Sequence, residues 1–338
     1  MADFSCDIVV VGAGVLGLSV AAELTARGRD VRVVDPCRTN ASAVAAGMIA
    51  PAFESLLDGV DAERAALLRD AAALWPEFAR RAGITLDETP AEWRGADAVE
   101  VAERLAALGF VVEAGTVSAA TDTRLDAAKS LYALKASLTA PVITEEARSI
   151  ERTADGWRVE TAEGSIRAAE AVIATGAAGA LEGLPHEVAA IVDGVQPVAG
   201  QIGHVSAPLT DRVLRGREGY VAPAEGGALI GATMQFGSRS LQPDPAASER
   251  LSQAAGRMLG IEAPVEIEWR TGVRGATPDG LPLAGPVSDG LHLALAPRRN
   301  GWLLGPLVGR IVADGIEGRP RGPHAAALDP LRPTLPAG

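Results

Sequence analysis

The chain has 338 residues, of which 48% are hydrophobic, and this is enough for a large core shared by two connected domains. Its formal net charge of −12 argues against nucleic-acid and anionic-membrane partners, because both bind basic surfaces. Cys6 and Cys37 are too few for a disulfide framework or a four-cysteine zinc site. The histidines lack ligand spacing, so we predict no metal centre and no catalytic histidine.

The first part of the chain predicts a strand, a tight turn, a helix and a second strand. Residues 8–11 form a β-branched apolar run suited to a buried parallel strand. Gly12 and Gly14 follow at once, apolar residues then recur at helical spacing, and Gly28 ends the helix. The second strand ends at Asp35. We interpret this stretch as a βαβ unit.

The glycines of this unit suggest a dinucleotide site. Gly12 allows the sharp turn, Gly14 lets a pyrophosphate approach the backbone, and Gly17 lets helix and strand pack closely. The positive end of the helix then faces the phosphates, and Asp35 is placed to accept a hydrogen bond from a ribose hydroxyl. The motif leaves FAD and NAD open. A glycine-rich turn in an ordinary α/β protein is the alternative, but it does not need Asp35.

The uncharged run over residues 8–22 could be mistaken for a secretion signal. Asp3 and Asp7 precede it where such a signal carries positive charge, and glycines interrupt it. No other segment has membrane-spanning length and apolarity. We therefore expect a cytoplasmic protein with no membrane partner.

The middle of the chain predicts helices followed by antiparallel strands. The helices are expected over residues 61–82, divided at Pro76, and over 98–108 and 125–138. A short strand is expected over 110–112. Alternating residues around glycine turns predict hairpins over 147–169, and an apolar strand over 171–174 leads into Thr175-Gly176.

The last third predicts a second set of antiparallel strands and two further helices. Strands are expected over residues 195–233, 265–274 and 291–296, and helices over 248–259 and 303–314. The Gly- and Pro-rich residues 275–286 predict a loop, and the tail from Pro320 is expected to pack loosely.

Several motifs, in this order and spacing, resemble the FAD-dependent D-amino-acid oxidase superfamily, and most closely its glycine oxidases of thiamine biosynthesis. Besides the glycine motif they are AAGM at 45–48, ATG at 174–176, GYVAP at 219–223, WRTGVRGATPDGLPLAG at 269–285 and RNGWLLGP at 299–306. The resemblance implies an α/β fold with a discontinuous Rossmann-like FAD-binding domain beside a substrate domain on an antiparallel or mixed sheet. The domains would comprise residues 1–80, 138–190 and 275–338, and residues 81–137 and 191–274.

FAD rather than NAD is the cofactor that the resemblance implies, and no second GxGxxG motif for a nicotinamide nucleotide occurs. The positive end of the helix that begins near Trp302 would stabilise the reduced flavin. The predicted cofactor-binding residues are Gly12, Gly14, Val15, Leu16, Gly17, Asp35, Arg38, Thr39, Ala46, Gly47, Met48, Thr175, Gly176, Arg299, Asn300, Gly301, Trp302 and Leu303.

The predicted substrate-binding residues are Arg274, Tyr220 and Met48. Arg274 matches the family's arginine that anchors the substrate carboxylate, and guanidinium can donate two parallel bonds to such a group. Its alternative role is a structural ion pair with Asp279 or a nearby glutamate. Tyr220 could donate its hydroxyl to the same carboxylate or be an ordinary core tyrosine, and Met48 could line the amine pocket or fill a gap in the core.

The activity that the resemblance implies is oxidation of glycine, or of another small D- or N-methyl amino acid or amine, to the imine. Molecular oxygen would be the acceptor and hydrogen peroxide the product, and hydrolysis of the imine would give the oxo acid and ammonia. The alternatives are a dehydrogenase with another acceptor, a tRNA methylaminomethyl-thiouridine oxidase, which the acidic charge disfavours, and a flavin-binding protein without catalysis.

The chain departs from the family at Gly275, where the family has proline, and at Pro297-Arg298, where it has His-Phe. The second departure predicts an added cation near the flavin and the substrate. The oligomeric state stays open.

Overall fold

The computed structural model describes residues 2–113 and 117–333, and within them the strands form three sheets. The first sheet has a parallel centre, in which β1 pairs with both β2 and β10, and β10 pairs with β18. Its strands, in spatial order, are β17 (Leu283–Ser288), β18 (Leu291–Leu295), β10 (Gly164–Ile173), β1 (Ala2–Val11) and β2 (Val31–Val34), and an antiparallel extension beyond β10 consists of β9 (Gly156–Glu160) and β8 (Ser149–Thr153).

Both faces of β1 are buried, which explains its continuous apolar run. Ile8 and Val10 join the core formed with α1 (Val15–Ala26) and α10 (Gly301–Ile316). Val9 and Val11 point to the other face and pack with α8 (His186–Asp193) and the β8–β9 hairpin. The strand is therefore the centre of a three-layer arrangement.

The second sheet is mostly antiparallel, and its longest pair joins β11 to β16 from Gln196↔Ala276 to Val205↔Ile267. Its strands are β15 (Gln235–Phe236), β11 (Gln196–Val205), β14 (Gly227–Gly231), β13 (Gly219–Ala224), β12 (Leu214–Gly216), β5 (Ala91–Trp93) and β6 (Ser118–Ala119), with β16 (Ile267–Ala276) on β11. The third sheet is small and contains β3 (Met48–Ile49), β7 (Thr123–Leu125) and β4 (Leu86–Asp87).

Short polar and glycine signals set the ends of the remaining helices. Asp61 and Asp244 accept backbone N–H groups in the first turns of α4 and α9, and Gly83 and Gly260 end α5 and α9 in the left-handed conformation, each with φ of +69°. These helices are α2 (Ala41–Val44), α3 (Pro51–Leu57), α4 (Ala62–Ala73), α5 (Trp75–Ala82), α6 (Ala98–Ala107), α7 (Ala127–Ala136), α9 (Pro245–Leu259) and α11 (Ala325–Leu328).

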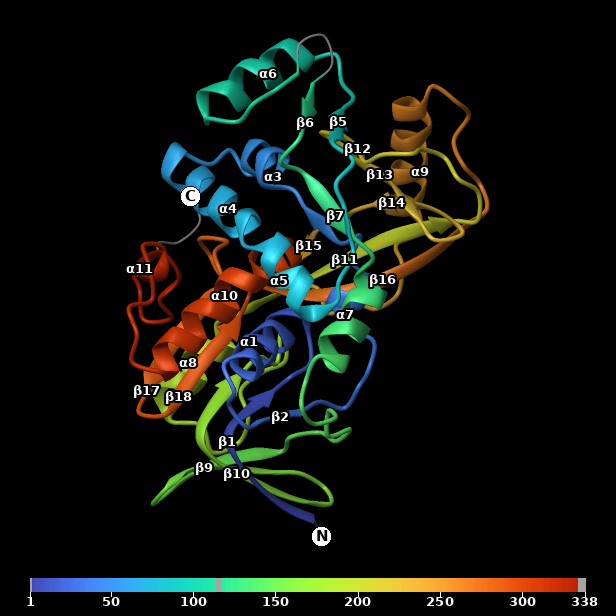
Figure 1. Ribbon diagram of the computed structural model, residues 1–338. Helices are drawn as coiled ribbons and strands as arrows, with labels where there is room; N and C mark the ends of the chain where they lie inside the picture. The colour runs from blue at the N-terminus through green and yellow to red at the C-terminus, as the bar shows by residue number, and fades with distance from the viewer. Residues whose placement is uncertain (1, 114–116, 334–338) are drawn as a thin grey trace.

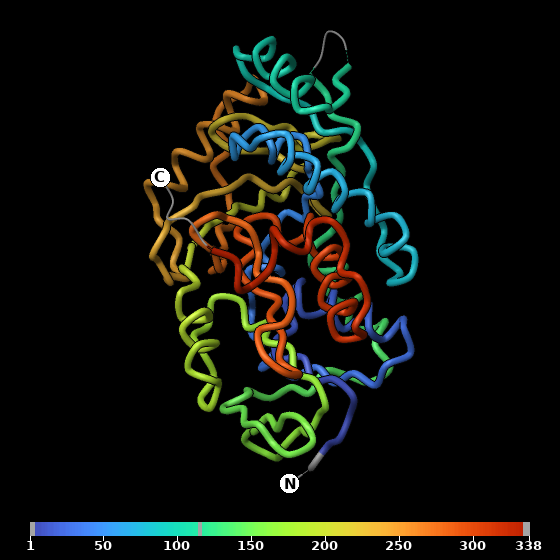
Figure 2. The backbone as a smooth tube through the Cα atoms, turned by 90° about the vertical axis from the view of Figure 1, so that its left-hand side faces the viewer, coloured from blue at the N-terminus to red at the C-terminus, as the bar shows by residue number. Residues whose placement is uncertain are grey.

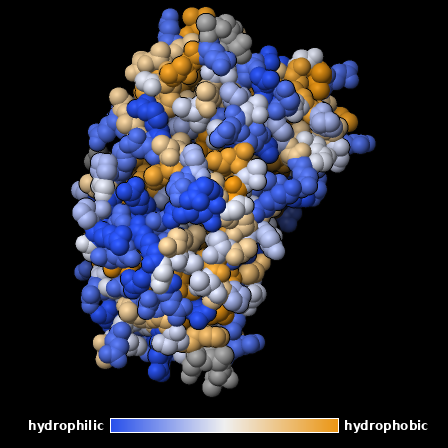
Figure 3. All heavy atoms as spheres, viewed as in Figure 1, coloured by the Kyte–Doolittle hydropathy of each residue, from blue (hydrophilic) through white to orange (hydrophobic). Residues whose placement is uncertain are grey.

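The molecule is elongated, with the β8–β10 hairpins and the N-terminus at one end and α6 at the other (Figures 1 and 2). Segments from the start, middle and end of the chain meet in the first sheet as β1, β10 and β18. On the face shown in Figure 3, hydrophilic residues surround scattered hydrophobic ones. None of the helices in the described ranges is both long and apolar enough to cross a membrane.

The predicted α/β class is confirmed, and the helices expected over 61–82, 98–108, 125–138, 248–259 and 303–314 are all present. The division at Pro76 is also correct, because α4 ends at Ala73 and α5 begins at Trp75. The predicted division into two domains stays a prediction, and residues 1, 114–116 and 334–338 of it lie outside the described residues. Helix α7, which that division groups with residues 81–137, packs in the core against α1.

Four local predictions were wrong. The strands expected over 165–169 and 171–174 form one strand, β10, because β1 pairs with it over its whole length. The loop expected over 275–286 contains the start of β17, whose residues pair with β18. Residues 110–112 form only an isolated bridge, Val112↔Ala119. The described part of the tail is anchored to the fold, because Leu328 is fully buried and Arg332 binds the Asp279 carboxylate, with Nε 2.8 Å from Oδ2. Residues 334–338 of the predicted tail lie outside the described residues.

Candidate functional site

A cavity of about 530 Å³ lies at the carboxyl ends of β1 and β10, beside the N-terminus of α1. It is lined by most of the predicted cofactor residues, namely Gly12, Gly14, Val15, Leu16, Asp35, Arg38, Thr39, Thr175, Gly176, Arg299, Gly301 and Trp302. These residues come from three distant parts of the chain. The carboxyl edge of parallel strands is where α/β folds bind nucleotides.

The glycines of the turn have distinct local roles. A Cβ on Gly12 would lie 2.3 Å from the Ala174 oxygen, and one on Gly17 would lie 2.1 Å from the Gly12 oxygen. Both positions therefore need glycine for close packing of the turn against β10 and α1. A Cβ on Gly14 would meet only the Ser42 hydroxyl, at 3.5 Å, so this backbone is open toward the cavity.

The polar atoms of this cavity fit a dinucleotide. The hydroxyl oxygen of Thr175 is buried and has no hydrogen-bond partner among the described residues, so a ligand group can satisfy it. The Asp35 carboxylate accepts the Ala13 and Cys37 N–H groups at 2.7 and 2.6 Å, which fixes it at the cavity edge. A carboxylate has further lone pairs, so Asp35 can still accept a hydrogen bond from a ribose hydroxyl.

Some predicted cofactor residues lie elsewhere. Ala46, Gly47, Met48 and Asn300 line a second, smaller cavity, whereas Gly17 and Leu303 line neither. The Leu303 side chain is fully buried, so only its backbone could meet a cofactor. Arg38 is exposed and pairs with Glu146 at 2.9 Å.

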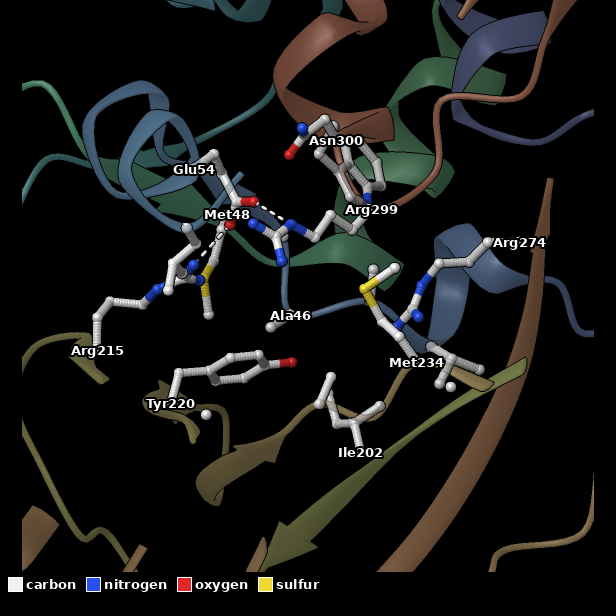
Figure 4. Close-up of a pocket in the computed structure, with 18 of the residues that line it drawn as sticks. Ala46, Met48, Glu54, Ile202, Arg215, Tyr220, Met234, Arg274, Arg299 and Asn300 are labelled. Atoms are coloured by element: carbon white, nitrogen blue, oxygen red, sulfur yellow. Dashed lines mark hydrogen bonds and ion pairs between the residues drawn. The ribbon is translucent and has the colours of Figure 1, made fainter. Parts of the chain in front are cut away.

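The second cavity, of about 180 Å³, adjoins the first and contains all three predicted substrate residues, Arg274, Tyr220 and Met48. Both cavities are lined by Arg274, Arg299, Trp302, Ala41 and Ala45. A ligand in the small cavity therefore shares a wall with a ligand in the large one. Figure 4 shows the side chains converging from β11, β13, β16 and the segment after α2.

Arg274 projects from β16 across β11, where its Nη1 donates to the Thr233 carbonyl at 3.2 Å. No carboxylate of the described residues forms an ion pair with it, since Asp279 binds Arg332 instead. The alternative role as the ion-pair partner of Asp279 is therefore excluded. Gly200 makes this course possible, because a Cβ there would lie 2.2 Å from Nη1 of Arg274. Burial lowers the pKa of Arg274, yet arginine keeps its charge.

Tyr220 stands on β13 opposite Gly231 of β14, and a Cβ on Gly231 would lie 2.3 Å from the tyrosine oxygen. Its ring packs under the Arg215 guanidinium, 5.7 Å from the ring centroid. Burial raises the pKa of Tyr220 to about 12, so the hydroxyl stays protonated as a donor. The hydroxyl points into the pocket (Figure 4).

The sequence did not reveal an ion-pair network at the other side of this pocket. Glu54 of α3 is buried and binds Arg215 at 2.6 Å and Arg299 at 2.5 Å. Burial would raise the pKa of Glu54, but the two arginines outweigh it and hold the pKa below its usual range. Asp58, one turn later, binds Arg299 at 3.0 Å and also Arg298. The predicted extra cation, Arg298, is thus paired with Asp58.

The match to known proteins agrees with this geometry. Residues 7–96 and 87–315 match the model of the family described as DAO, FAD dependent oxidoreductase. The chain belongs to this family. It is therefore an FAD-dependent oxidoreductase, as the sequence motifs predicted, and its cofactor is FAD.

Among its relatives, the chain is 30% identical to the glycine oxidase of Geobacillus kaustophilus strain HTA426, over 92% of this chain and 93% of that protein. It is 32% identical to the bifunctional protein ThiO/ThiG of Nostoc strain PCC 7120, over 92% of this chain but only 52% of the relative. The chain thus spans about half the length of that bifunctional relative. Its fold resembles the crystal structure of glycine oxidase from Geobacillus kaustophilus, with a TM-score of 0.78, 23% identity and coverage of 98% and 99% of the two chains.

Proposed function

We propose that the protein oxidises glycine or another small D- or N-methyl amino acid to the imine, with molecular oxygen as acceptor and hydrogen peroxide as product. The observation that carries this proposal is Arg274, a guanidinium in the wall between the two cavities with no carboxylate partner among the described residues. Such a group is suited to bind the α-carboxylate of an amino acid. The glycine oxidase names of full-length relatives support the same assignment.

In this proposal the protein mainly positions the substrate. Arg274 holds the carboxylate, the Tyr220 hydroxyl donates to it, and Met48 and Met234 restrict the remaining space. The FAD residues are those predicted from the sequence, with the turn after β1 and Asp35 at the nucleotide end and Gly301 and Trp302 near the substrate. When bound, FAD accepts the hydride from the α-carbon, so no protein base has to take that hydrogen as a proton.

The proposed place of this reaction is the cytoplasm, where the free thiols Cys6 and Cys37 stay reduced. The proposed partners are the small substrate and oxygen, without nucleic acid or membrane, and the oligomeric state stays open.

The test combines a substrate panel with the Arg274→Ala variant. Purified holoenzyme is mixed anaerobically with glycine, sarcosine, D-alanine and D-proline, and bleaching of the flavin is followed. Peroxide release is then measured in air. Arg274→Ala is expected to raise KM for carboxylated substrates strongly, because the charge-assisted hydrogen bonds that it removes are worth about 2 kcal/mol or more. An unchanged KM would show that another residue binds the substrate carboxylate. Reduction of an artificial electron-accepting dye without release of peroxide would indicate a dehydrogenase.

A further inference from the structure

The small cavity has a second cationic end, formed by Arg215 on β12. This side chain is only 5% exposed, and its Nη2 binds Glu54. Its Nη1 contacts the Met48 sulfur at 2.7 Å, and its Nε is buried without a hydrogen-bond partner in the described part of the chain. A thioether is a weak acceptor, so this guanidinium is poorly satisfied by the protein itself.

The carboxylate that Arg215 uses is shared. Glu54 also binds Arg299, and Arg299 in turn shares Asp58 with Arg298. Of the charged side chains that line the pocket, Arg215, Arg217, Arg274 and Arg299 outnumber Glu54 and Glu218. Arg217 and Glu218 pair outside the pocket with Asp97 and Arg257, so Arg215, Arg274 and Arg299 are left with Glu54 as the carboxylate in the lining. Burying such an excess is costly unless a ligand anion compensates for it.

The two poorly satisfied guanidinium groups lie on opposite sides of the pocket. In Figure 4, Arg274 enters from one side and Arg215 lies beyond Met48 on the other, with the Tyr220 ring between them. A single carboxylate bound to Arg274 would leave Arg215 with only the Met48 sulfur and the Glu54 carboxylate that it shares with Arg299. An amino acid with a neutral side chain would therefore satisfy Arg274 but not Arg215.

We propose that the substrate is an amino acid with a second acidic group, and that Arg215 is the residue that binds this group. This inference rests on the proposed function, because that function assigns the α-carboxylate to Arg274. Glu54 then acts as a positioning residue, which holds Arg215 and Arg299 at the cavity wall.

The experiment measures anion binding to the holoenzyme through the flavin absorbance, independently of turnover. Acetate is the probe with one carboxylate, and malonate, succinate and glutarate carry two at increasing spacing. We expect the best dicarboxylate to bind at least about tenfold more tightly than acetate, which corresponds to ~1.4 kcal/mol. Arg215→Gln should lower this ratio by about tenfold, and Arg215→Lys should restore part of it.

Arg212→Gln is the matched control. This arginine precedes the same strand, is half-buried and pairs with Asp211 at 3.0 Å, and it lines neither cavity. In this variant the ratio of dicarboxylate affinity to acetate affinity should equal that of the wild type. In turnover, iminodiacetate and D-aspartate should exceed sarcosine and D-alanine in kcat/KM, measured as anaerobic flavin reduction.

The two proposals fail in different ways. If acetate does not bind, or binds equally well to Arg274→Ala, the proposed function fails. If acetate binds through Arg274 but no dicarboxylate gains affinity in the wild-type protein, the Arg215 proposal alone is overturned. An equal loss of acetate and succinate affinity in Arg215→Gln would also overturn it, because it would indicate a purely structural role.

Discussion

Single residues of this site fall into those that a motif reveals and those that only the fold brings together. Arg274 and Tyr220 stand in recognisable sequence stretches and do line one pocket. Arg215 and Glu54 lie 161 residues apart, in segments without a motif, and meet only because β12 lies close to α3. The available signal was the one charged residue of the largely apolar PAFESLL stretch, Glu54, because a buried charge requires a partner.

Gly200, which lies beneath Arg274, gives a prediction at this scale. Gly200→Ala places a Cβ 2.2 Å from Nη1 of Arg274 and 2.5 Å from the Thr233 oxygen, so the guanidinium must move. We expect KM for glycine to rise by about tenfold or more, because misplacing a charge-assisted contact costs over ~1 kcal/mol. Steady-state kinetics at saturating FAD test this.

The Tyr220→Phe variant is the comparison, since it removes one hydroxyl and leaves Arg274 in place. It should raise KM less than Gly200→Ala does. A Gly200→Ala enzyme with wild-type KM would show that the course of Arg274 across β11 is unimportant for substrate binding.

At the scale of elements, the short helix α3 is the support of the pocket. It carries Glu54 and is followed directly by Asp58, and its first turn donates the Ala52 and Phe53 N–H groups to the buried Asp122 at 2.8 and 2.9 Å. Burial raises the pKa of Asp122 to about 7, above the ordinary value of 3.8. The helix was not predicted from the sequence, because it is short and its cap comes from a residue 70 positions away.

The raised pKa gives a signed pH dependence. Between about pH 4 and 7 the folded protein binds a proton at Asp122 that the unfolded chain has lost, so this residue makes stability fall as pH rises through that window. Asp122→Asn should remove this contribution. Its free energy of unfolding, measured by urea denaturation of the holoenzyme, should fall less between pH 5 and 7.5 than that of the wild type.

Asp126→Asn serves as the control, because the Asp126 carboxylate caps α7 and accepts only the Lys129 N–H, at 2.9 Å, within the described hydrogen bonds. The free energy of unfolding of this variant should change with pH as that of the wild type does. Identical slopes for Asp122→Asn and the wild type would contradict the raised pKa.

Strands were predicted well where neighbouring residues in the sequence determine them. Alternation and glycine turns located the hairpins that became β8, β9, β13 and β14. The continuous β10 was missed because its length depends on pairing with β1, from Ala2↔Gly164 to Val11↔Ile173. The start of β17 was missed for the same reason, since glycine and proline dominate its sequence while β18 supplies its partners.

For the whole molecule, the larger cavity joins segments that are distant in the chain. Gly12, Thr175 and Gly301 line it from the first, middle and last parts of the sequence. The α/β class and this meeting of segments could be predicted, because the βαβ motif and the family resemblance both imply them. The shapes of the cavities could not, because they depend on side-chain packing.

FAD should therefore stabilise the entire fold. Removing it is expected to lower the melting temperature, and adding it back at 100 times its Kd should restore about 2.7 kcal/mol. Differential scanning fluorimetry of apoprotein with increasing FAD checks this, with riboflavin as the control that lacks the nucleotide. An apoprotein that melts at the holoenzyme temperature would contradict it.

The shared wall between the cavities limits how this enzyme can acquire new substrates. Arg274, Arg299 and Trp302 line both cavities, so under the proposed function we expect a change at any of them to alter substrate fit and flavin electronics together. Ile202 and Met234 line only the smaller one, and neither takes part in the ion pairs of Arg299. We expect variation at these two positions to alter substrate preference while the redox potential stays close to its original value, which makes them the natural positions for divergence and for directed evolution.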